Sequence, residues 1–123
     1  MQQDESPIRI KSKAFAVRIV KLTQYLQDEL KEFVLSNQIK KSGTSIGANV
    51  RESKNAQSRA DFINKLQIAL KESDETEYWL ELLFETDYIN QAAFDSLMAD
   101  NKELTAMLTS IINTTKNNDN TKS

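Results

Sequence analysis

Carboxylates are the main side chains here that could catalyse a reaction or bind a metal, because the chain contains no cysteine and no histidine. It therefore has no thiolate nucleophile, no imidazole acid or base and none of the usual zinc ligands. The carboxylates are densest from Glu72 to Asp87, where seven acids occur without a base. A di-metal helical bundle would also need Glu-x-x-His pairs. A magnesium site made of carboxylates alone stays open, but we favour an acidic surface that faces solvent or another subunit.

Two other arrangements give little support for an enzyme. Ser45 follows Lys41 at the four-residue spacing of a helix, but a Ser–Lys dyad also needs a pocket and an oxyanion hole. Gly43 and Gly47 match neither the G-x-G-x-x-G motif nor the P-loop pattern. The sequence therefore predicts a non-enzymatic protein without a cofactor.

A group of basic residues lies in the middle of the chain, namely Lys40, Lys41, Arg51, Lys54 and Arg59. If they share one face, they could hold the phosphates of RNA or DNA. However, this region lacks the aromatic residues that a single-strand reader places among its cations. The alternative, which we favour, is that these cations pair with acidic residues of another helix or another subunit.

The segment from Lys41 to Glu52 consists almost wholly of small residues and contains both glycines of the chain. Ile46 and Val50 are four residues apart, as on one face of a helix. A glycine inside a helix costs about 0.5–1 kcal/mol relative to alanine. We therefore expect this segment to form a thin helix whose close packing against another helix offsets that cost.

Three polar residues of the same segment, Ser45, Asn49 and Glu52, recur at steps of four and three. On a helix they would form one line beside the apolar positions and would be partly buried. Because buried polar groups need partners, these three residues and Gly47 are candidates for fixing the register between helices. A line that faces solvent is the alternative.

Apolar residues that recur at steps of three and four predict four helices. The helices are expected from about residue 8 or 12 to 35, from 37 to 56, from 59 to 86, and from 91 or 93 to 114. Their expected inward positions are Phe15, Ile19, Leu22, Leu26, Leu30 and Phe33; Ile39, Gly43, Ile46 and Val50; Phe62, Leu66, Ala69, Ser73, Thr76, Leu80 and Leu83; and Phe94, Leu97, Leu104, Leu108 and Ile111. Short turns between four helices indicate an all-α, antiparallel up-down-up-down four-helix bundle. The predicted bundle domain covers residues 12–115, between a flexible leader at 1–11 and a disordered polar tail at 116–123.

The charge is distributed unevenly along the chain, although the net charge is only −2. Residues 1–71 have a balance of +6, and residues 72–123 have a balance of −8. A chain with a basic half and an acidic half can bind copies of itself head to tail.

The third predicted helix has a second apolar line, which includes Trp79 and Leu82. Two apolar lines on one helix indicate that it contacts more than one neighbour, in the same chain or in another subunit. Glu72, Glu75, Trp79 and Leu82 are therefore the candidate contacts between subunits.

Several stretches resemble the bacterial four-helix bundle family named for proteins encoded in 23S rRNA intervening sequences. Residues 42–52, Ser-Gly-Thr-Ser-Ile-Gly-Ala-Asn-Val-Arg-Glu, are similar to the family pattern R-S-x-x-S-I-x-x-N-I-x-E. The likeness extends through residues 15–19, 58–62, 66–69 and 72–80, and it covers about residues 12–115. It implies a four-helix bundle, commonly a homopentameric barrel, without an established enzymatic activity. It also implies similarity to accessory proteins of diversity-generating retroelements, which bind a reverse transcriptase and nucleic acid.

We expect a cytoplasmic protein, because the polar, acidic N-terminus is unlike a signal peptide and no apolar run approaches the ~20 residues of a membrane span. The favoured function is a homo-oligomeric assembly or scaffold module whose partner is itself, with a pentamer as the expected form. The alternative is an accessory protein that binds RNA, DNA or a nucleic-acid-binding protein.

Overall fold

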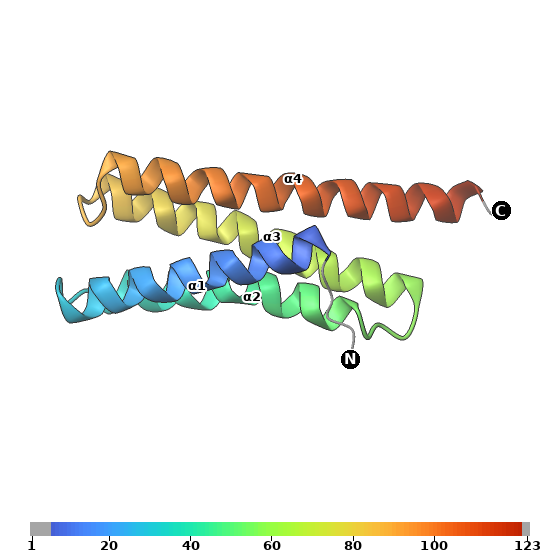
Figure 1. Cartoon of the computed structure of the whole chain (residues 1–123), viewed down its shortest axis with the longest axis horizontal. Coiled ribbons are helices and arrows are strands. Elements are labelled where there is room, and N and C mark those ends of the chain that lie inside the picture. Colours follow the sequence, from blue (N-terminus) through green and yellow to red (C-terminus); the bar gives the residue numbers. More distant parts are fainter. Residues whose placement is uncertain (1–5, 122–123) are drawn as a thin grey trace.

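The computed structural model describes residues 6–121, with side chains placed for residues 6–118. Its helices are α1 Pro7–Asp28, α2 Val34–Ser53, α3 Arg59–Glu85 and α4 Gln91–Thr121 (Figure 1). Between residues 6 and 121 the remainder is turn and connection, with no strand. Helix α2 contacts α1 and α3, and α4 contacts α3 and, less extensively, α1. The predicted all-α, up-down-up-down four-helix bundle is confirmed.

The antiparallel direction of α1 and α4 follows from two polar contacts between them. Lys11 Nζ lies 2.8 Å from Glu103 Oε2. Further along α1, Arg18 Nη2 donates to Ser96 Oγ at 2.9 Å, and Ser96 precedes Glu103 in α4. The two helices therefore run in opposite directions.

Most of the predicted inward positions form the core of the bundle. The buried apolar ones are Phe15, Ile19, Leu26, Ile39, Ile46, Val50, Leu66, Ala69, Leu80, Leu83, Leu97, Leu104 and Leu108. Gly43, Ser73 and Thr76 are buried as well. Leu22, Phe62, Phe94 and Ile111 are half-buried and pack against this core. Every helix thus contributes a line of apolar residues at the helical period, which is the reason the chain folds as a bundle.

The turn between α1 and α2 differs from the prediction that the first helix continues to residue 35. Helix α1 ends at Asp28, and Lys31 has a φ of 56°, a left-handed conformation that no right-handed helix can accommodate. The Glu32 carboxylate then accepts hydrogen bonds from the backbone N–H groups of Leu35 (2.9 Å) and Ser36 (3.0 Å). These N–H groups lack partners inside the helix, so Glu32 caps the start of α2. As a result, Leu30 and Phe33 are exposed instead of buried.

Both glycines lie inside α2 with ordinary helical φ values and face α1. A Cβ atom on Gly43 would lie 2.8 Å from Ile19 Cγ1, and one on Gly47 would lie 3.3 Å from the Ser12 carbonyl oxygen. A larger residue at Gly43 would force Ile19 to shift, and one at Gly47 would crowd the backbone of α1 at Ser12. The expectation that the glycines permit close packing is therefore confirmed.

A buried polar layer connects α2, α3 and α4. Asn101 Nδ2 donates to the Ser73 carbonyl oxygen at 2.9 Å, and Ser73 Oγ donates to Asn101 Oδ1 at 2.9 Å. On the neighbouring turn of α3, Thr76 Oγ1 donates to Ser42 Oγ of α2 at 2.9 Å. These side chains are buried, and no buried polar side-chain atom of residues 6–118 lacks a partner.

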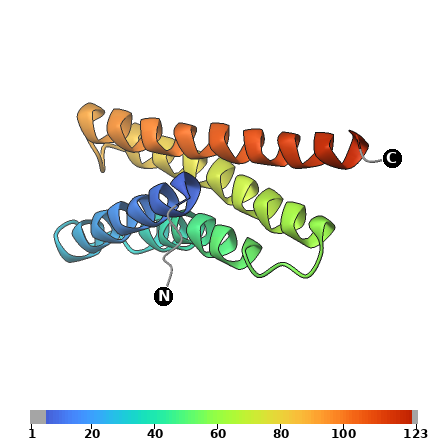
Figure 2. The same ribbon diagram turned by 45° about the vertical axis from the view of Figure 1, so that its right-hand side comes forward.

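Both ends of the bundle differ from the predicted domain limits. Pro7 lies in the first turn of α1, where its fixed φ suits a helix, so residues 7–11 belong to α1 and not to a leader. Residues 116–121, predicted as a disordered tail, continue α4, since extending an existing helix needs no new nucleation. The remainder of the predicted leader and tail, residues 1–5 and 122–123, lies outside the described residues. In both ribbon views α4 reaches beyond the start of α1 (Figure 1 and Figure 2). Over the described part of the chain, no helix is long and apolar enough to cross a membrane.

Candidate interaction face

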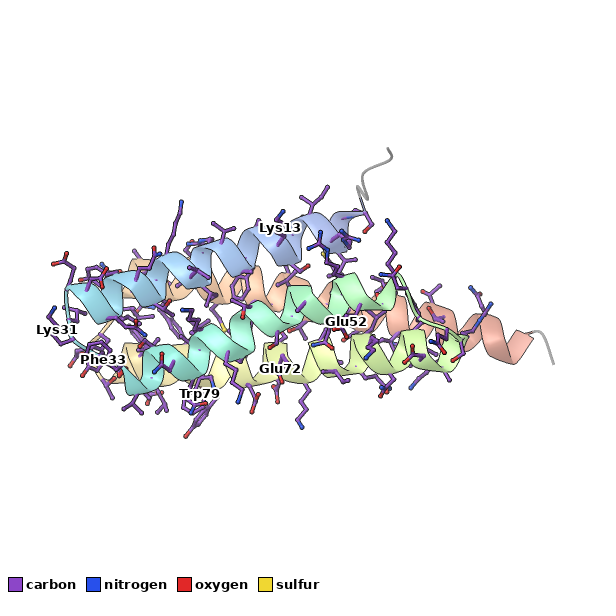
Figure 3. All side chains as sticks on the ribbon, turned by 90° about the horizontal axis from the view of Figure 1, so that it is seen from below. Lys13, Lys31, Phe33, Glu52, Glu72 and Trp79 are labelled. Carbon is purple, nitrogen blue, oxygen red and sulfur yellow. The ribbon has the colours of Figure 1, made fainter. Side chains whose placement is uncertain are left out.

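One side of the bundle, formed by neighbouring edges of α2 and α3, brings together most of the residues that the sequence singled out. We call it the α2–α3 face. Its members are Ser45, Asn49 and Glu52 of α2 and Lys65, Ile68, Glu72, Glu75, Trp79 and Leu82 of α3. The α3 members follow one another at steps of three and four, which puts them on one stripe. Figure 3 shows the labelled Glu52, Glu72 and Trp79 along this side of the two helices.

The two helices are linked across this face by an ion pair. Lys65 Nζ lies 3.2 Å from Glu52 Oε2, with the lysine partly shielded and the glutamate largely exposed. An exposed pair of this kind contributes little to stability, about 0–1 kcal/mol. It marks where the C-terminal end of α2 meets the first turns of α3.

Ser45 and Asn49 are half-buried, but their hydrogen bonds stay within α2. Ser45 Oγ donates to the Lys41 carbonyl oxygen at 2.7 Å, and Asn49 Nδ2 donates to the Ser45 carbonyl oxygen at 2.9 Å. Neither of these two bonds connects α2 to another helix. Ser42, through its bond with Thr76, provides that connection. A role of Ser45 and Asn49 between subunits stays a prediction.

The carboxylates of the face are concentrated at Glu72 and Glu75, one turn apart on α3. Burial is the largest cause that raises the pKa of Glu72 above the ordinary 4.5, followed by the charge of Glu75 and a hydrogen bond with it. Lys71 and Lys41 act in the opposite direction, and Lys41 reaches across from α2. The protein thus keeps a carboxyl group where its charge is poorly solvated and repelled by a neighbour.

The apolar end of the face lies where α3 passes the start of α2. Trp79 and Leu82 are half-buried, while Tyr78, beside them, is 56% exposed. The rings of Tyr78 and Trp79 meet edge to face, with their centroids 5.0 Å apart. Large aromatic groups in partial contact with water are typical of surfaces that bind other proteins.

The five basic residues proposed for contacts with nucleic acid are all exposed, but they do not gather on one surface. Lys41 lies on the α3 side of α2, near Glu72. Arg59 stands at the start of α3, where it lines a shallow surface pocket with Phe62, Thr115 and Asn118. The sequence alone could not separate these positions, because it places all five in one short stretch.

The structure offers few groupings for catalysis or metal binding. Among the side chains placed, no three acidic residues, or histidines or cysteines, are arranged to hold a metal ion. The hydroxyl group of Ser45 is bonded to the carbonyl oxygen of Lys41, not to its amine.

Several residues that matter for the fold and surface were missed from the sequence. Glu32 caps α2. The sequence contained a signal for this cap, because a carboxylate stands three residues before Leu35, just ahead of a helical pattern. Asn101 completes the inward line of Leu97 and Leu104, but an amide in that position was not recognised as buried. Ile10 and Val17, which are exposed on the outside of α1, were also missed. Their signal in the sequence was that they alternate with Lys13 and Lys21 at helical spacing.

Comparison with known proteins identifies the family. The model of the 23S rRNA-intervening sequence protein family matches residues 5–110. A crystal structure of a protein with unknown function from the S23 ribosomal protein family of Bacteroides thetaiotaomicron is 60% identical. That match covers 85% of this chain and 97% of that chain, with a TM-score of 0.85. No curated protein matches the sequence. Since the family match spans most of the chain and the whole α2–α3 face, the chain belongs to the family of 23S rRNA-intervening sequence proteins.

Proposed function

We propose that the protein is a non-enzymatic assembly module of the cytoplasm, which acts by associating with copies of itself, with five copies as the expected number. The observation that carries this proposal is the α2–α3 face. It places half-buried Ile68, Trp79 and Leu82 beside Glu75 and the partly desolvated carboxylate of Glu72. Apolar residues that gather on one side of a protein can mark a surface where another protein binds.

Light scattering at micromolar concentration and physiological salt tests the proposal. The expected mass is several times the 14.0 kDa of one chain. Trp79→Ala is expected to lower the mass, because it removes the largest apolar side chain of the face. Phe33→Ala is the matched control, since Phe33 is an exposed aromatic residue in the turn between α1 and α2. A mass of 14.0 kDa for the unaltered chain would end the proposal.

A second candidate is an accessory protein that binds RNA or DNA through α2. It is favoured by Lys40, Arg51 and Lys54, which are exposed and make no ion pair within residues 6–118. A mobility-shift assay with structured RNA at low and moderate salt tests it. Binding should weaken as salt rises, because cations that neutralise phosphates release counterions. It should also weaken when Lys40, Lys41 and Arg51 are changed together to glutamate. The absence of any shift at low salt would rule this candidate out.

A further inference from the structure

The outer side of α1 carries four residues that no other part of the bundle covers. Ile10, Lys13, Val17 and Lys21 follow one another at steps of three and four, so they share one stripe of the helix. Ile10 is 54% exposed, Val17 is 46% exposed, and both lysines are exposed. We call these four residues the α1 line.

The lysines of the α1 line have no partner of opposite charge within residues 6–118. This separates them from Lys11 and Arg18 on the same helix, which pair with Glu103 and Asp100 of α4. The cations of α1 therefore have two different surroundings. Lys11 and Arg18 form ion pairs with α4 of the same chain. Lys13 and Lys21 point away from the bundle, beside Ile10 and Val17.

The α2–α3 face also combines apolar and charged residues along one stripe, but its order differs and the charges of this stripe are negative. Ile68, Glu72, Glu75 and Trp79 follow one another at steps of four, three and four, with the carboxylates between the apolar residues. Neither glutamate makes an ion pair with any side chain placed in the structure. Lys41 and Lys71 act on Glu72 from nearby, but Glu72 and Glu75 both remain without an ion pair within residues 6–118, and the α1 line presents the opposite charge.

Over their whole length, α1 and α3 also carry opposite net charges. Helix α1 has five basic residues and one acidic residue, whereas α3 has three basic residues and seven acidic residues. Opposite charges of this kind steer two surfaces toward each other and disfavour contacts between like surfaces. A contact between α1 of one copy and α3 of another is favoured over α1 with α1 or α3 with α3.

We propose that the α1 line of one copy docks on the α2–α3 face of the next copy. Ile10 and Val17 then lie against Ile68 and Trp79, and the lysines of the line approach the two glutamates of the face. This inference rests on the proposed function and names the two surfaces that would carry it out. Since different surfaces meet, the association is head to tail and forms a ring or a chain of copies.

The two surfaces cannot meet within one chain. Over residues 6–121, no Cα atom of α1 lies within 8 Å of a Cα atom of α3. In Figure 3, Lys13 lies on one side of the bundle and Trp79 on the opposite side. Each copy therefore has both surfaces free at the same time, which is what a head-to-tail assembly needs.

Charge reversal tests the proposal by light scattering. Lys13→Glu with Lys21→Glu, and separately Glu72→Lys with Glu75→Lys, should each reduce the assembly to single chains of 14.0 kDa. A chain with all four changes should assemble again, because both surfaces have exchanged their charges. Lys31→Glu with Lys116→Glu is the control: it changes the net charge as much as the first variant, at exposed residues outside both surfaces. Circular dichroism confirms that each variant is helical.

Disulfide trapping gives a second test in chains that keep most of their charges, because the protein has no cysteine of its own. Val17→Cys chains are mixed with chains that carry Ile68→Cys, Glu75→Cys or Trp79→Cys, and the mixtures are oxidised. At least one mixture should give a covalent dimer of the two different chains. Val17→Cys mixed with Thr109→Cys, on the exposed side of α4, should not.

The outcomes separate this inference from the proposed function. If the unaltered chain assembles, but neither double reversal lowers its mass and no α2–α3 face cysteine is trapped, the copies use other surfaces and the inference is wrong. A reversal could also break the assembly while the variant with all four changes stays monomeric. In that case a covalent dimer in the disulfide test supports the inference, and the absence of that dimer overturns it. If the unaltered chain is a monomer, the proposed function and this inference fall together.

Discussion

At the scale of single residues, the contact between Gly43 and Ile19 determines how closely α1 and α2 pack. A Cβ atom on Gly43 would lie 2.8 Å from Cγ1 and 2.9 Å from Cγ2 of Ile19, which is fully buried. Gly43→Ala should therefore lower the free energy of unfolding by about 1–3 kcal/mol through overpacking, despite the better helix propensity of alanine. Denaturant unfolding at one protein concentration measures this change.

A double variant shows whether Ile19 is the cause. Ile19→Ala alone should cost about 2–5 kcal/mol, because it leaves a cavity in the core. In the double variant the methyl group that Gly43→Ala adds occupies part of that cavity, so the total loss should be smaller than the sum of the two single losses. If the losses simply add, the close approach at Gly43 is not what limits the packing.

Glu72 gives the stability of the protein a dependence on pH at the residue scale. Its pKa in the folded chain is raised above 4.5 by burial and by Glu75, so the folded state holds its proton more tightly than the unfolded state. The resulting stabilisation is complete below pH 4.5 and is lost as the pH rises through the raised pKa. Glu72→Gln keeps a neutral side chain at every pH. Its unfolding free energy, relative to the unaltered chain, should therefore increase from about pH 4 to about pH 7.

The comparison needs a control, because replacing any glutamate by glutamine also changes the net charge of the chain. Glu85→Gln replaces an exposed glutamate at the end of the same helix. The difference between the two variants, measured by denaturant unfolding at each pH, isolates Glu72. A Glu72→Gln curve that runs parallel to that of the unaltered chain would show that the site does not favour the protonated carboxyl group.

At the scale of the helices, the turn between α1 and α2 is set by the residues that stop one helix and start the next. Glu32→Ala removes the acceptor of the Leu35 and Ser36 N–H groups, and it should lower the unfolding free energy by about 0.5–2 kcal/mol. Lys31→Val should also destabilise, because a β-branched residue is poorly tolerated at a φ of 56°. Thermal unfolding of the two variants measures both effects.

Lys31→Gly is the matched control for this turn, because glycine adopts a left-handed conformation without strain. It should leave the stability within about 1 kcal/mol of the unaltered chain. If Lys31→Gly and Lys31→Val destabilise equally, the backbone conformation at residue 31 is not what separates α1 from α2.

The helices themselves could be predicted because burial repeats with the helical period. Leu66, Ala69, Ser73, Thr76 and Leu80 are all inward residues of α3, as their spacing indicates. Even the two small polar members of that line are buried, since they bond to groups on α2 and α4. The spacing alone was enough to predict the inward residues of α3, because one face of this helix packs against the rest of the bundle.

The end of α1 could not be predicted in the same way. Leu30 and Phe33 continue the spacing of the inward line, so the apolar pattern runs on past the point where the helix stops. The stop depends on a left-handed residue and on a carboxylate cap, and neither changes the apolar pattern. The candidate site could also be predicted only in part. The sequence indicated Glu72 and Trp79 as surface contacts, but only the packing of α2 against α3 shows that these residues share a face with Asn49.

At the scale of the whole molecule, the bundle presents two surfaces of opposite charge on opposite sides. The α1 line is apolar and basic, and the α2–α3 face is apolar and acidic. The contacts inside the bundle use other cations, such as Arg18 with Asp100 and Lys102 with Glu77. The charge asymmetry of the sequence is thus only partly neutralised within one chain, and the remainder is available for association.

Native mass spectrometry of the unaltered chain tests most directly whether the protein assembles with itself, because it counts the copies in each complex. We expect one dominant species that contains several chains of 14.0 kDa, with five as the expected number. That species should dissociate as the ionic strength is raised, since exposed charge pairs are screened by salt. A spectrum that contains only the 14.0 kDa chain at micromolar concentration and low salt would contradict self-association.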